Sequence, residues 1–312
     1  MKVLVTPRSF GKTDDAPFQI LRDADLEIVP NPRGGILSEE ELIAALDGCD
    51  GVIVGVDPLT RRVLHSAKQL RAVAKYGVGT DNIDLVAAAE LDIPVSRTVG
   101  ANAKAVADYA FALMLSAARR VGEIDAHCRK GDWGKRIGLD VCGKTLGLIG
   151  LGAIGREMVK RARGFEMTVL AEDVVWDSAY AEANGVIHTG IPEICARADF
   201  ISLHVPLTDA TRGLIGAEEL RLMKPAAIVI NSARGGLIDE NALLHALKER
   251  RIYAAGLDAF ATEPPDDPEW FTLDNAILGS HCAASTDGAV TAMGVMAARN
   301  LVRDLCQLTI DN

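Results

Sequence analysis

Residues 141–155 read VCGKTLGLIGLGAIG, and this stretch decides the fold. An apolar run over residues 146–149 leads into Gly150, Gly152 and Gly155, which have the spacing G-x-G-x-x-G. The pattern predicts a buried strand, a tight turn and the start of a helix. The first glycine allows the turn, the second lets backbone N–H groups approach a pyrophosphate, and the third lets the helix pack on the strand.

The residues after this turn strengthen the interpretation. An amphipathic segment over residues 156–165 is followed by a second apolar run over 167–170 and by Asp173. Asp173 lies 18 positions after Gly155 (173 minus 155), close to the ~20 residues at which an acid binds a ribose 2′-hydroxyl. Val174 and Val175 supply no arginine for a 2′-phosphate. The stretch therefore predicts an NAD site and disfavours NADP, whereas an isolated glycine-rich turn would be weak evidence.

The composition excludes several classes of partner. The chain has 312 residues, a net charge of −10 and a pI near 5.1. No basic surplus is available to neutralise phosphates, so we expect neither a nucleic-acid nor an anionic-membrane partner. The most apolar helical pattern, residues 105–118, contains Asp108 and is shorter than the ~20 residues that span a bilayer.

The cysteines and the N-terminus bear on the cellular compartment. Six scattered cysteines form no C-x-x-C pair, and MKVLVTPRSF lacks a secretory pattern. We expect reduced thiols in a cytoplasmic protein, with no disulfide framework and no metal site.

Short apolar runs alternate with helical patterns along the whole chain, which predicts parallel α/β architecture. The expected strands lie at residues 3–6, 26–29, 51–54, 72–75, 94–96, 146–149, 168–171, 200–203, 227–231, 254–258 and 276–278. Expected helices include residues 38–46, where Ser38 and Glu41 form a capping box, 84–90, a long helix over 103–120, and a helical pattern after Ser285 through residue 305.

The glycine turn in mid-chain predicts two doubly wound, Rossmann- or flavodoxin-like domains with the active site in the cleft between them. We expect a cofactor domain over residues 99–284, inserted within a discontinuous substrate domain of residues 1–98 and 285–312. Residues 122–139 show little apolar periodicity and are expected to form an arm or long loop. We expect a homodimer, formed through the long apolar helix and this arm with its Trp133.

Three polar residues follow expected strands, where α/β proteins place their chemistry. Arg234 follows one strand in NSARGG, Glu263 the next in GLDAFATEPP, and His281 the last in LGSHCAAS. Arginine can grip a carboxylate with two hydrogen bonds, and histidine can donate a proton near neutral pH while a carboxylate holds its tautomer. Beside a dinucleotide, this set predicts hydride transfer to and from a carbonyl next to a carboxylate.

Each residue alone has a simpler explanation. Arg234 could pair with a surface acid, Glu263 could be a loop carboxylate, and His281 could be structural. Their position at three successive strand ends favours the functional interpretation. A nucleophilic pair of His281 with Cys282 is disfavoured, because successive residues of an extended segment point to opposite sides.

Six spaced segments carry a resemblance to a known family. They are KYGVGTDNID (75–84), GKTLGLIGLGAIG (143–155), LHVPLT (203–208), MKPAAIVINSARGGLID (223–239), GLDAFATEPP (256–265) and SHCAAST (280–286). In this order the chain resembles the D-isomer-specific 2-hydroxyacid dehydrogenase family, nearest to its 3-phosphoglycerate dehydrogenase branch in a short form without a regulatory domain.

The resemblance implies roles for individual residues. Arg234 would hold the substrate carboxylate and keto oxygen, and His281, paired with Glu263, would exchange the proton. Substrate would also contact Lys75, Asn102 and the N–H groups of Val78 and Gly79. The cofactor would contact Thr98, Gly150, Gly152, Ala153, Ile154, Gly155, Asp173, His204, Val205, Pro206, Ser232, Ala233, Arg234, Asp258, His281 and Ala283. Asp258 would act through the nicotinamide amide, and its alternative is a helix-capping or strand-end carboxylate.

The expected function is NAD-dependent interconversion of a small D-2-hydroxy acid and its 2-keto acid. The substrate could be 3-phosphoglycerate or another acid with an anionic substituent, for which Lys75, Arg97 and Lys104 are candidate cations. Two alternatives stay open: an NAD(H)-sensing binding protein similar to the family's corepressors, and a formate-type dehydrogenase. Ser280, Cys282 and Ala283 depart from the usual family residues without removing a catalytic group.

Overall fold

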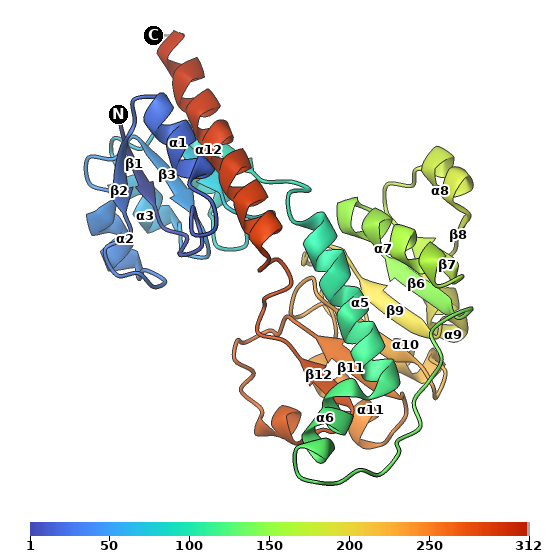
Figure 1. The fold of residues 1–312 in the computed structure, drawn as a ribbon. Helices are drawn as coiled ribbons and strands as arrows, with labels where there is room; N and C mark the ends of the chain where they lie inside the picture. The colour runs from blue at the N-terminus through green and yellow to red at the C-terminus, as the bar shows by residue number, and fades with distance from the viewer. Residues whose placement is uncertain (311–312) are drawn as a thin grey trace. The chain divides into compact units, whose positions relative to one another are not determined.

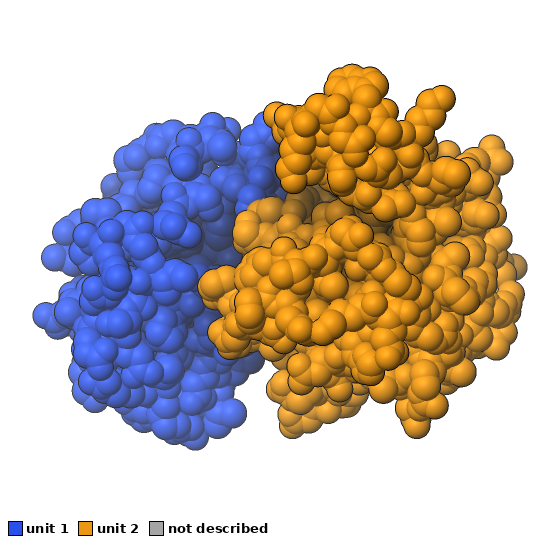
Figure 2. All heavy atoms as spheres, turned by 90° about the horizontal axis from the view of Figure 1, so that it is seen from below, with its two compact units in different colours: residues 1–102, 285–312 blue, residues 103–284 orange. Residues whose placement is uncertain are grey.

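The computed structural model describes residues 1–310, with side chains through residue 306. The chain forms two compact units, distinguished by colour in Figure 2. The first contains residues 1–102 and the chain from residue 285 onward, and the second contains residues 103–284. The boundaries lie at 102/103 and 284/285, compared with the 98/99 and 284/285 expected from the sequence.

The first unit is built on a five-stranded parallel sheet with the order β2-β1-β3-β4-β5. Its strands are β1 (Lys2–Val5), β2 (Glu27–Pro30), β3 (Gly51–Val54), β4 (Ala72–Lys75) and β5 (Val95–Arg97). Its helices are α1 (Ala16–Asp23), α2 (Glu39–Ala45), α3 (Arg61–Ser66), α4 (Leu85–Glu90) and α12 (Asp287–Ile310). The capping box of Ser38 and Glu41 begins α2 as predicted.

Alternating strand residues face two apolar layers in this unit. Leu4, Val52 and Val54 pack with residues of α2, α3 and α4. Val3 and Ile53 pack on the other face with residues of α1 and α12. Because both faces are covered, the strands read as continuous apolar runs, which is typical of parallel sheets.

The second unit is built on a seven-stranded parallel sheet with the order β12-β11-β10-β9-β6-β7-β8. The strands are β6 (Thr145–Ile149), β7 (Thr168–Glu172), β8 (Val186–His188), β9 (Phe200–Leu203), β10 (Ile228–Asn231), β11 (Ala254–Leu257) and β12 (Ala276–Leu278). The helices are α5 (Ala103–Arg119), α6 (Val121–Cys128), α7 (Ala153–Gly164), α8 (Ser178–Asn184), α9 (Ile191–Arg197), α10 (Ala217–Leu222) and α11 (Glu240–Lys248), with a 3₁₀ turn at Pro268–Thr272.

Helices cover both faces of this sheet, as Figure 1 shows for α5, which lies across it beside α7. Ile228 and Ile230 pack with α5 and α7, while Val229 packs with α9, α10 and α11 on the opposite face. Two all-parallel sheets with helical layers confirm the predicted α/β fold class.

Two expectations about elements were wrong, and one strand was missed. Residues 122–139 were expected to form an arm or loop, but their first part belongs to helix α6. None of the α6 residues is buried, so no apolar periodicity could indicate this helix. Strand β8 was missed, because it is a three-residue edge strand with one buried residue. Helix α5 was expected to expose apolar side chains, but Phe111, Leu113 and Met114 are buried within its own unit.

Candidate functional site

The three predicted catalytic side chains follow adjacent strands of the seven-stranded sheet. Arg234 follows β10, Glu263 follows β11, and His281 follows β12. Because the strands are parallel and paired in this order, their carboxyl ends lie at one edge of the sheet. Parallel α/β proteins bind their ligands at this edge.

Glu263 and His281 form a direct pair. Both carboxylate oxygens of Glu263 lie 2.9 Å from Nδ1 of His281. The side chains keep 39% and 46% of their surface exposed, so the pair can reach a small ligand. Occupation of Nδ1 by the carboxylate leaves Nε2 as the nitrogen that can exchange a proton with substrate.

The backbone of His281 is held in an unusual conformation. Its φ of 55° is in the left-handed region, which few residues other than glycine adopt. The buried Asp258 stabilises this turn: its backbone oxygen accepts from His281 N–H at 2.9 Å. Its carboxylate accepts from Cys282 N–H at 3.0 Å and Ala283 N–H at 2.8 Å. Asp258 therefore orients the His281 turn, close to the strand-end alternative considered for it.

Cys282 does not form a pair with His281. Its Sγ–H donates to the hydroxyl of Tyr109 on α5 at 3.3 Å. Burial, followed by this hydrogen bond, raises the pKa of Tyr109, which therefore remains a neutral phenol. The contact supplies a further attachment of the His281 turn to α5.

The loop that carries Arg234 is organised by Asn231, the last residue of β10. The Asn231 side chain accepts from Ala233 N–H at 3.1 Å and donates to the Arg234 carbonyl at 2.7 Å. The next residue, Gly235, leaves no room for a side chain: a Cβ there would lie 1.9 Å from the carbonyl carbon of Phe260. The Arg234 loop (residues 232–239) is thus in backbone contact with the loop that carries Glu263.

The glycine turn lies further along the same edge, between β6 and α7. Gly150 has a φ of 103°, and a Cβ there would lie 2.6 Å from the His204 carbonyl oxygen. A Cβ on Gly155 would lie 2.2 Å from the Gly150 carbonyl oxygen. Gly152 differs, because no atom lies within 4 Å of its Cβ position. Gly152 caps α7 without a side-chain hydrogen bond, so the N–H groups of Ala153 and Ile154 begin the helix beside an open space.

Asp173 follows β7, and its side chain connects the glycine turn to the loop after β7. Its carboxylate accepts from Leu151 N–H at 2.6 Å and from Val175 N–H at 2.9 Å. Val174 and Val175 beside it are highly exposed, at 99% and 80%. The site therefore has an anionic group and an apolar surface together.

Two buried polar atoms at this edge have no hydrogen-bond partner among the described residues: His204 Nδ1 and Ser232 Oγ. His204 follows β9, and Ser232 follows β10. The His204 residue keeps some exposed surface, but its ring is enclosed, and burial lowers its pKa to about 3. It is therefore a neutral ring close to Gly150. Such unpartnered polar atoms indicate a place for a polar ligand.

The remaining predicted cofactor residues border the same edge. Val205 and Pro206 follow His204 at the end of β9, and Val205 Cγ1 is 3.0 Å from the Cβ position of Gly150. Ala233 belongs to the Arg234 loop, and Ala283 is buried next to Asp258. Together with Gly150, Gly152, Ala153, Ile154, Gly155, Asp173, His204 and Ser232, they form a continuous border.

The other predicted site residues belong to the first unit. Val78 is 37% exposed, and the N–H groups of Val78 and Gly79 have no acceptor within the described chain. Lys75 is only 6% exposed, and its ammonium group donates to the Gly55 carbonyl and to Asn82. The ammonium group is thus held by groups of its own unit, and contact of Lys75 with substrate stays a prediction.

The Thr98 side chain is also hydrogen-bonded within its own unit. Thr98 is fully buried, and its hydroxyl accepts from Gly77 N–H at 2.9 Å. It fixes the turn before Val78, and contact of Thr98 with the cofactor stays a prediction. Asn102 is partly exposed at the end of this unit.

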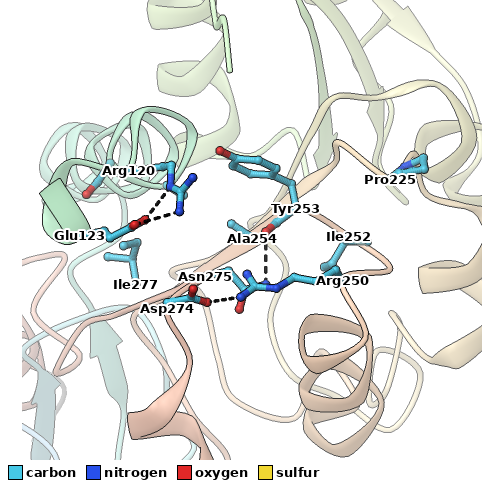
Figure 3. A pocket seen from close by; sticks show the side chains of 12 residues that line it. Arg120, Glu123, Pro225, Arg250, Ile252, Tyr253, Ala254, Asp274, Asn275 and Ile277 are labelled. Atoms are coloured by element: carbon cyan, nitrogen blue, oxygen red, sulfur yellow. Dashed lines mark hydrogen bonds and ion pairs between the residues drawn. The ribbon is translucent and has the colours of Figure 1, made fainter. Parts of the chain in front are cut away.

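A cavity of about 290 Å³ lies at the opposite edge of the sheet. Tyr253 and Asn275, which line it, immediately precede β11 and β12 (Figure 3). Its arginines are paired, Arg250 with Asp274 at 2.5 Å and Arg120 with Glu123. This cavity contains no histidine and is separate from the catalytic edge.

Comparison with known proteins identifies the family. The model of "D-isomer specific 2-hydroxyacid dehydrogenase, NAD binding domain" matches residues 111–283. The chain is 44% identical to D-3-phosphoglycerate dehydrogenase of Methanocaldococcus jannaschii over 86% of its length, and spans 52% of that relative. It is 40% identical to glyoxylate reductase of Korarchaeum cryptofilum, covering 85% of this chain and 82% of the relative.

A solved structure supports the same assignment. The TT0316 protein of Thermus thermophilus aligns with a TM-score of 0.90 and 36% identity, covering 98% of this chain and 97% of that one. The seven-stranded unit is thus the NAD-binding domain of a 2-hydroxyacid dehydrogenase. The chain belongs to the D-isomer specific 2-hydroxyacid dehydrogenase family.

Two contributors to the site were missed in the sequence. Glu240, the first residue of α11, accepts from Ala261 N–H at 2.7 Å. Its position beside the helix cap Asp239 resembles that of any acid in a first helical turn, so no local pattern reveals this contact. One feature of the sequence could have indicated the close contact at Gly235: the pair of glycines that follows Arg234.

Proposed function

We propose that this chain is an NAD-dependent dehydrogenase that interconverts a small D-2-hydroxy acid and its 2-keto acid. The observation that carries the proposal is the Glu263–His281 pair, with both carboxylate oxygens 2.9 Å from Nδ1, at the same sheet edge as Arg234 and the glycine turn. A charged fork, a proton donor and a dinucleotide turn are the groups that carbonyl reduction beside a carboxylate requires.

In reduction, Arg234 binds the substrate carboxylate and the keto oxygen, orienting the carbonyl carbon. Protonated His281 donates the Nε2 proton to the carbonyl oxygen as it becomes a hydroxyl. Glu263 stabilises the imidazolium before transfer and holds the Nδ1–H tautomer afterward. In oxidation, neutral His281 accepts the hydroxyl proton at Nε2.

The residues present fit NAD. The open space beside Gly152 and the uncapped start of α7 suit a pyrophosphate, and the carboxylate of Asp173 suits a ribose hydroxyl. The unpartnered Ser232 Oγ and His204 Nδ1 suit further polar atoms. When bound, NADH would supply the hydride in reduction, and NAD⁺ would accept it in oxidation.

The substrate class is proposed from the relatives and from residues of the first unit. Relatives include proteins named phosphoglycerate dehydrogenase, glyoxylate reductase and hydroxypyruvate reductase. We propose that the N–H groups of Val78 and Gly79 bind the substrate carboxylate, with Asn102 as a further contact. Since Lys75 is engaged internally, exposed Arg97 and Lys104 are the cations left for an anionic substituent such as a phosphate.

A substrate panel tests this proposal. NADH oxidation should be measured with glyoxylate, hydroxypyruvate and 3-phosphohydroxypyruvate, and NAD reduction with formate. We expect turnover with at least one 2-keto acid. NADH binding without any turnover would favour the NAD(H)-sensing alternative, and turnover of formate alone would favour the formate-type enzyme.

Substitution of Arg234 tests its assigned role. Arg234→Ala should raise KM for the keto acid and lower kcat, because the arginine contacts both bound substrate and the reacting oxygen. The expected loss in kcat/KM is roughly 10- to 100-fold or more, typical of a lost hydrogen bond to a charged group. Unchanged KM and kcat would remove Arg234 from the site.

We also propose a homodimer formed by the second unit. The support is the segment after α6, where Trp133 is 81% and Ile137 is 88% exposed, while α5 is mostly buried. Light scattering should give twice the 33.2 kDa chain mass, and Trp133→Ala should weaken association. A wild-type monomer would contradict this proposal.

All six cysteines are unpaired, which supports a reducing compartment such as the cytoplasm. Among the described helices, none has the length and apolar character needed to cross a bilayer.

A further inference from the structure

Two neighbouring backbone N–H groups in the loop that carries Glu263 (residues 258–265) are bound by different glutamates. Phe260 N–H donates to Glu263 Oε1 at 3.1 Å. Ala261 N–H donates to Glu240 Oε1 at 2.7 Å. Because these donors are adjacent in the chain, the carboxylate of Glu240 lies close to the Glu263–His281 pair without contacting His281.

Glu240 also faces the Arg234 loop. It is half-buried at the first position of α11, directly after Asp239, which ends that loop and caps the helix by accepting from Ala242 N–H at 3.0 Å. Burial raises the pKa of Glu240 above its ordinary value, and the negative charges of Glu263 and Asp239 add to this effect. The carboxylate therefore binds the backbone of the Glu263 loop from the first turn of α11, which directly follows the Arg234 loop.

The same two loops touch at Gly235. A Cβ at this position would lie 1.9 Å from the Phe260 carbonyl carbon and 2.2 Å from Ala261 N. This contact limits how closely the loops can approach. It does not prevent the Glu263 loop from moving away, because van der Waals contact resists compression much more than separation.

We infer that Glu240 is a positioning residue for the proposed reaction: its carboxylate holds the Glu263 loop against the Arg234 loop and so fixes the Glu263–His281 pair relative to Arg234. The inference rests on the proposed function. Gly235 sets the closest approach of the loops, and Glu240 prevents their separation. A displacement of about 1 Å in such a pair can cost on the order of 100-fold in rate.

The test compares Glu240→Ala with Glu240→Gln. Alanine removes the acceptor, so kcat for keto-acid reduction should fall roughly 10- to 100-fold. Glutamine keeps an oxygen acceptor and should restore kcat to within about threefold of wild type. NADH affinity should stay unchanged in both, since Glu240 lies away from the glycine turn.

Glu219→Ala provides a matched control. Glu219 is an acid in the first turn of α10 of the same unit, and it accepts from Gly216 N–H at 2.9 Å. Its loss should lower thermal stability to a similar extent and leave kcat unchanged. If Glu219→Ala lowers kcat as much as Glu240→Ala does, or if Glu240→Gln is as impaired as alanine, the inference is wrong.

A measurement without turnover separates this inference from the proposed function. The ¹⁵N shifts of the His281 ring at alkaline pH, assigned with His281→Ala, report which nitrogen carries the proton. Wild type and Glu240→Gln should show the Nδ1–H tautomer that Glu263 favours, and Glu240→Ala should shift toward Nε2–H. An unchanged tautomer in Glu240→Ala overturns the inference, whereas absence of turnover in wild type with the expected tautomers overturns only the proposed function.

Discussion

The two ends of the carboxyl edge of the seven-stranded sheet use different means of binding. At the end formed by β6 and β7, the groups proposed to bind the cofactor pyrophosphate are backbone N–H groups, which are accessible because Gly152 has no side chain. At the end formed by β10, β11 and β12, the groups proposed for catalysis are the side chains of Arg234, Glu263 and His281, and their loops are held by hydrogen bonds. Binding at the cofactor end therefore depends on the absence of a side chain at Gly152. The proposed chemistry at the catalytic end depends on the positions of three side chains.

The largest effect should come from the catalytic end. His281→Ala removes the proton donor, so kcat should fall about 10²–10⁴-fold, the usual contribution of general acid–base catalysis. NADH binding, followed by fluorescence, should stay near the wild-type value, because the glycine turn is unaltered. A variant that retains most of its activity would show that another group donates the proton.

The cofactor end can be tested with two glycines that differ in their surroundings. Gly155→Ala should lower thermal stability and abolish NADH binding, because the new Cβ would lie 2.2 Å from a backbone oxygen that cannot move aside. Gly152→Ala should fold with an unchanged Tm, since its φ of −72° suits alanine and its Cβ position is open. Its NADH affinity should nevertheless fall by roughly tenfold or more, because the methyl group occupies the approach of the pyrophosphate.

Equal NADH affinity in Gly152→Ala and wild type would contradict this account of the cofactor end. Calorimetry and NADH titration on both variants give the two readouts.

The buried His204 predicts how the cofactor end responds to acid. Its folded-state pKa of about 3 is below the ordinary value of about 6.5 for histidine, so the unfolded chain binds a proton that the folded chain does not. The contribution of His204 to the free energy of unfolding is fully present above pH 6.5 and is lost progressively as the pH falls toward 3. Between pH 7 and pH 5 the free energy of unfolding should decrease by about 2 kcal/mol from this group.

Urea unfolding at several pH values checks the prediction. His204→Gln should make the pH dependence of the free energy of unfolding shallower than in wild type. Parallel slopes for wild type and His204→Gln would show that the ring is not kept neutral by burial.

The smallest effect concerns cofactor choice. Asp173 should accept hydrogen bonds from the ribose hydroxyl and repel a 2′-phosphate, so kcat/KM should favour NAD over NADP. Asp173→Ala should reduce this ratio by about tenfold, the value of a 1.4 kcal/mol interaction. The variant should also lose some stability, because Asp173 accepts from Leu151 and Val175 N–H groups. A wild-type preference for NADP would contradict the assignment.

Much of the site was predictable because its residues lie next to strongly patterned strands. The runs before Gly150, Arg234 and His281 are short, apolar and buried, so the strand ends could be located from sequence and the parallel sheet brought them to one edge. The hydrogen bonds of Lys75 with Asn82 and of Thr98 with Gly77 could not be predicted from the sequence. A lysine or threonine at the end of a strand has the same local pattern whether its side chain faces a ligand or its own loop.

The sequence by itself determined the parallel α/β fold, the glycine turn with its acid after β7, and the order of the three proposed catalytic groups along the chain. These properties depend on local periodicity and on backbone conformations that few residues adopt. Only the tertiary structure decided that Asp258 holds the His281 turn, that Gly235 touches the Glu263 loop, and that Glu240 binds Ala261. Those contacts join segments separated by about 20 residues or more, and a hydrogen bond between two loops leaves no periodic trace in either of them.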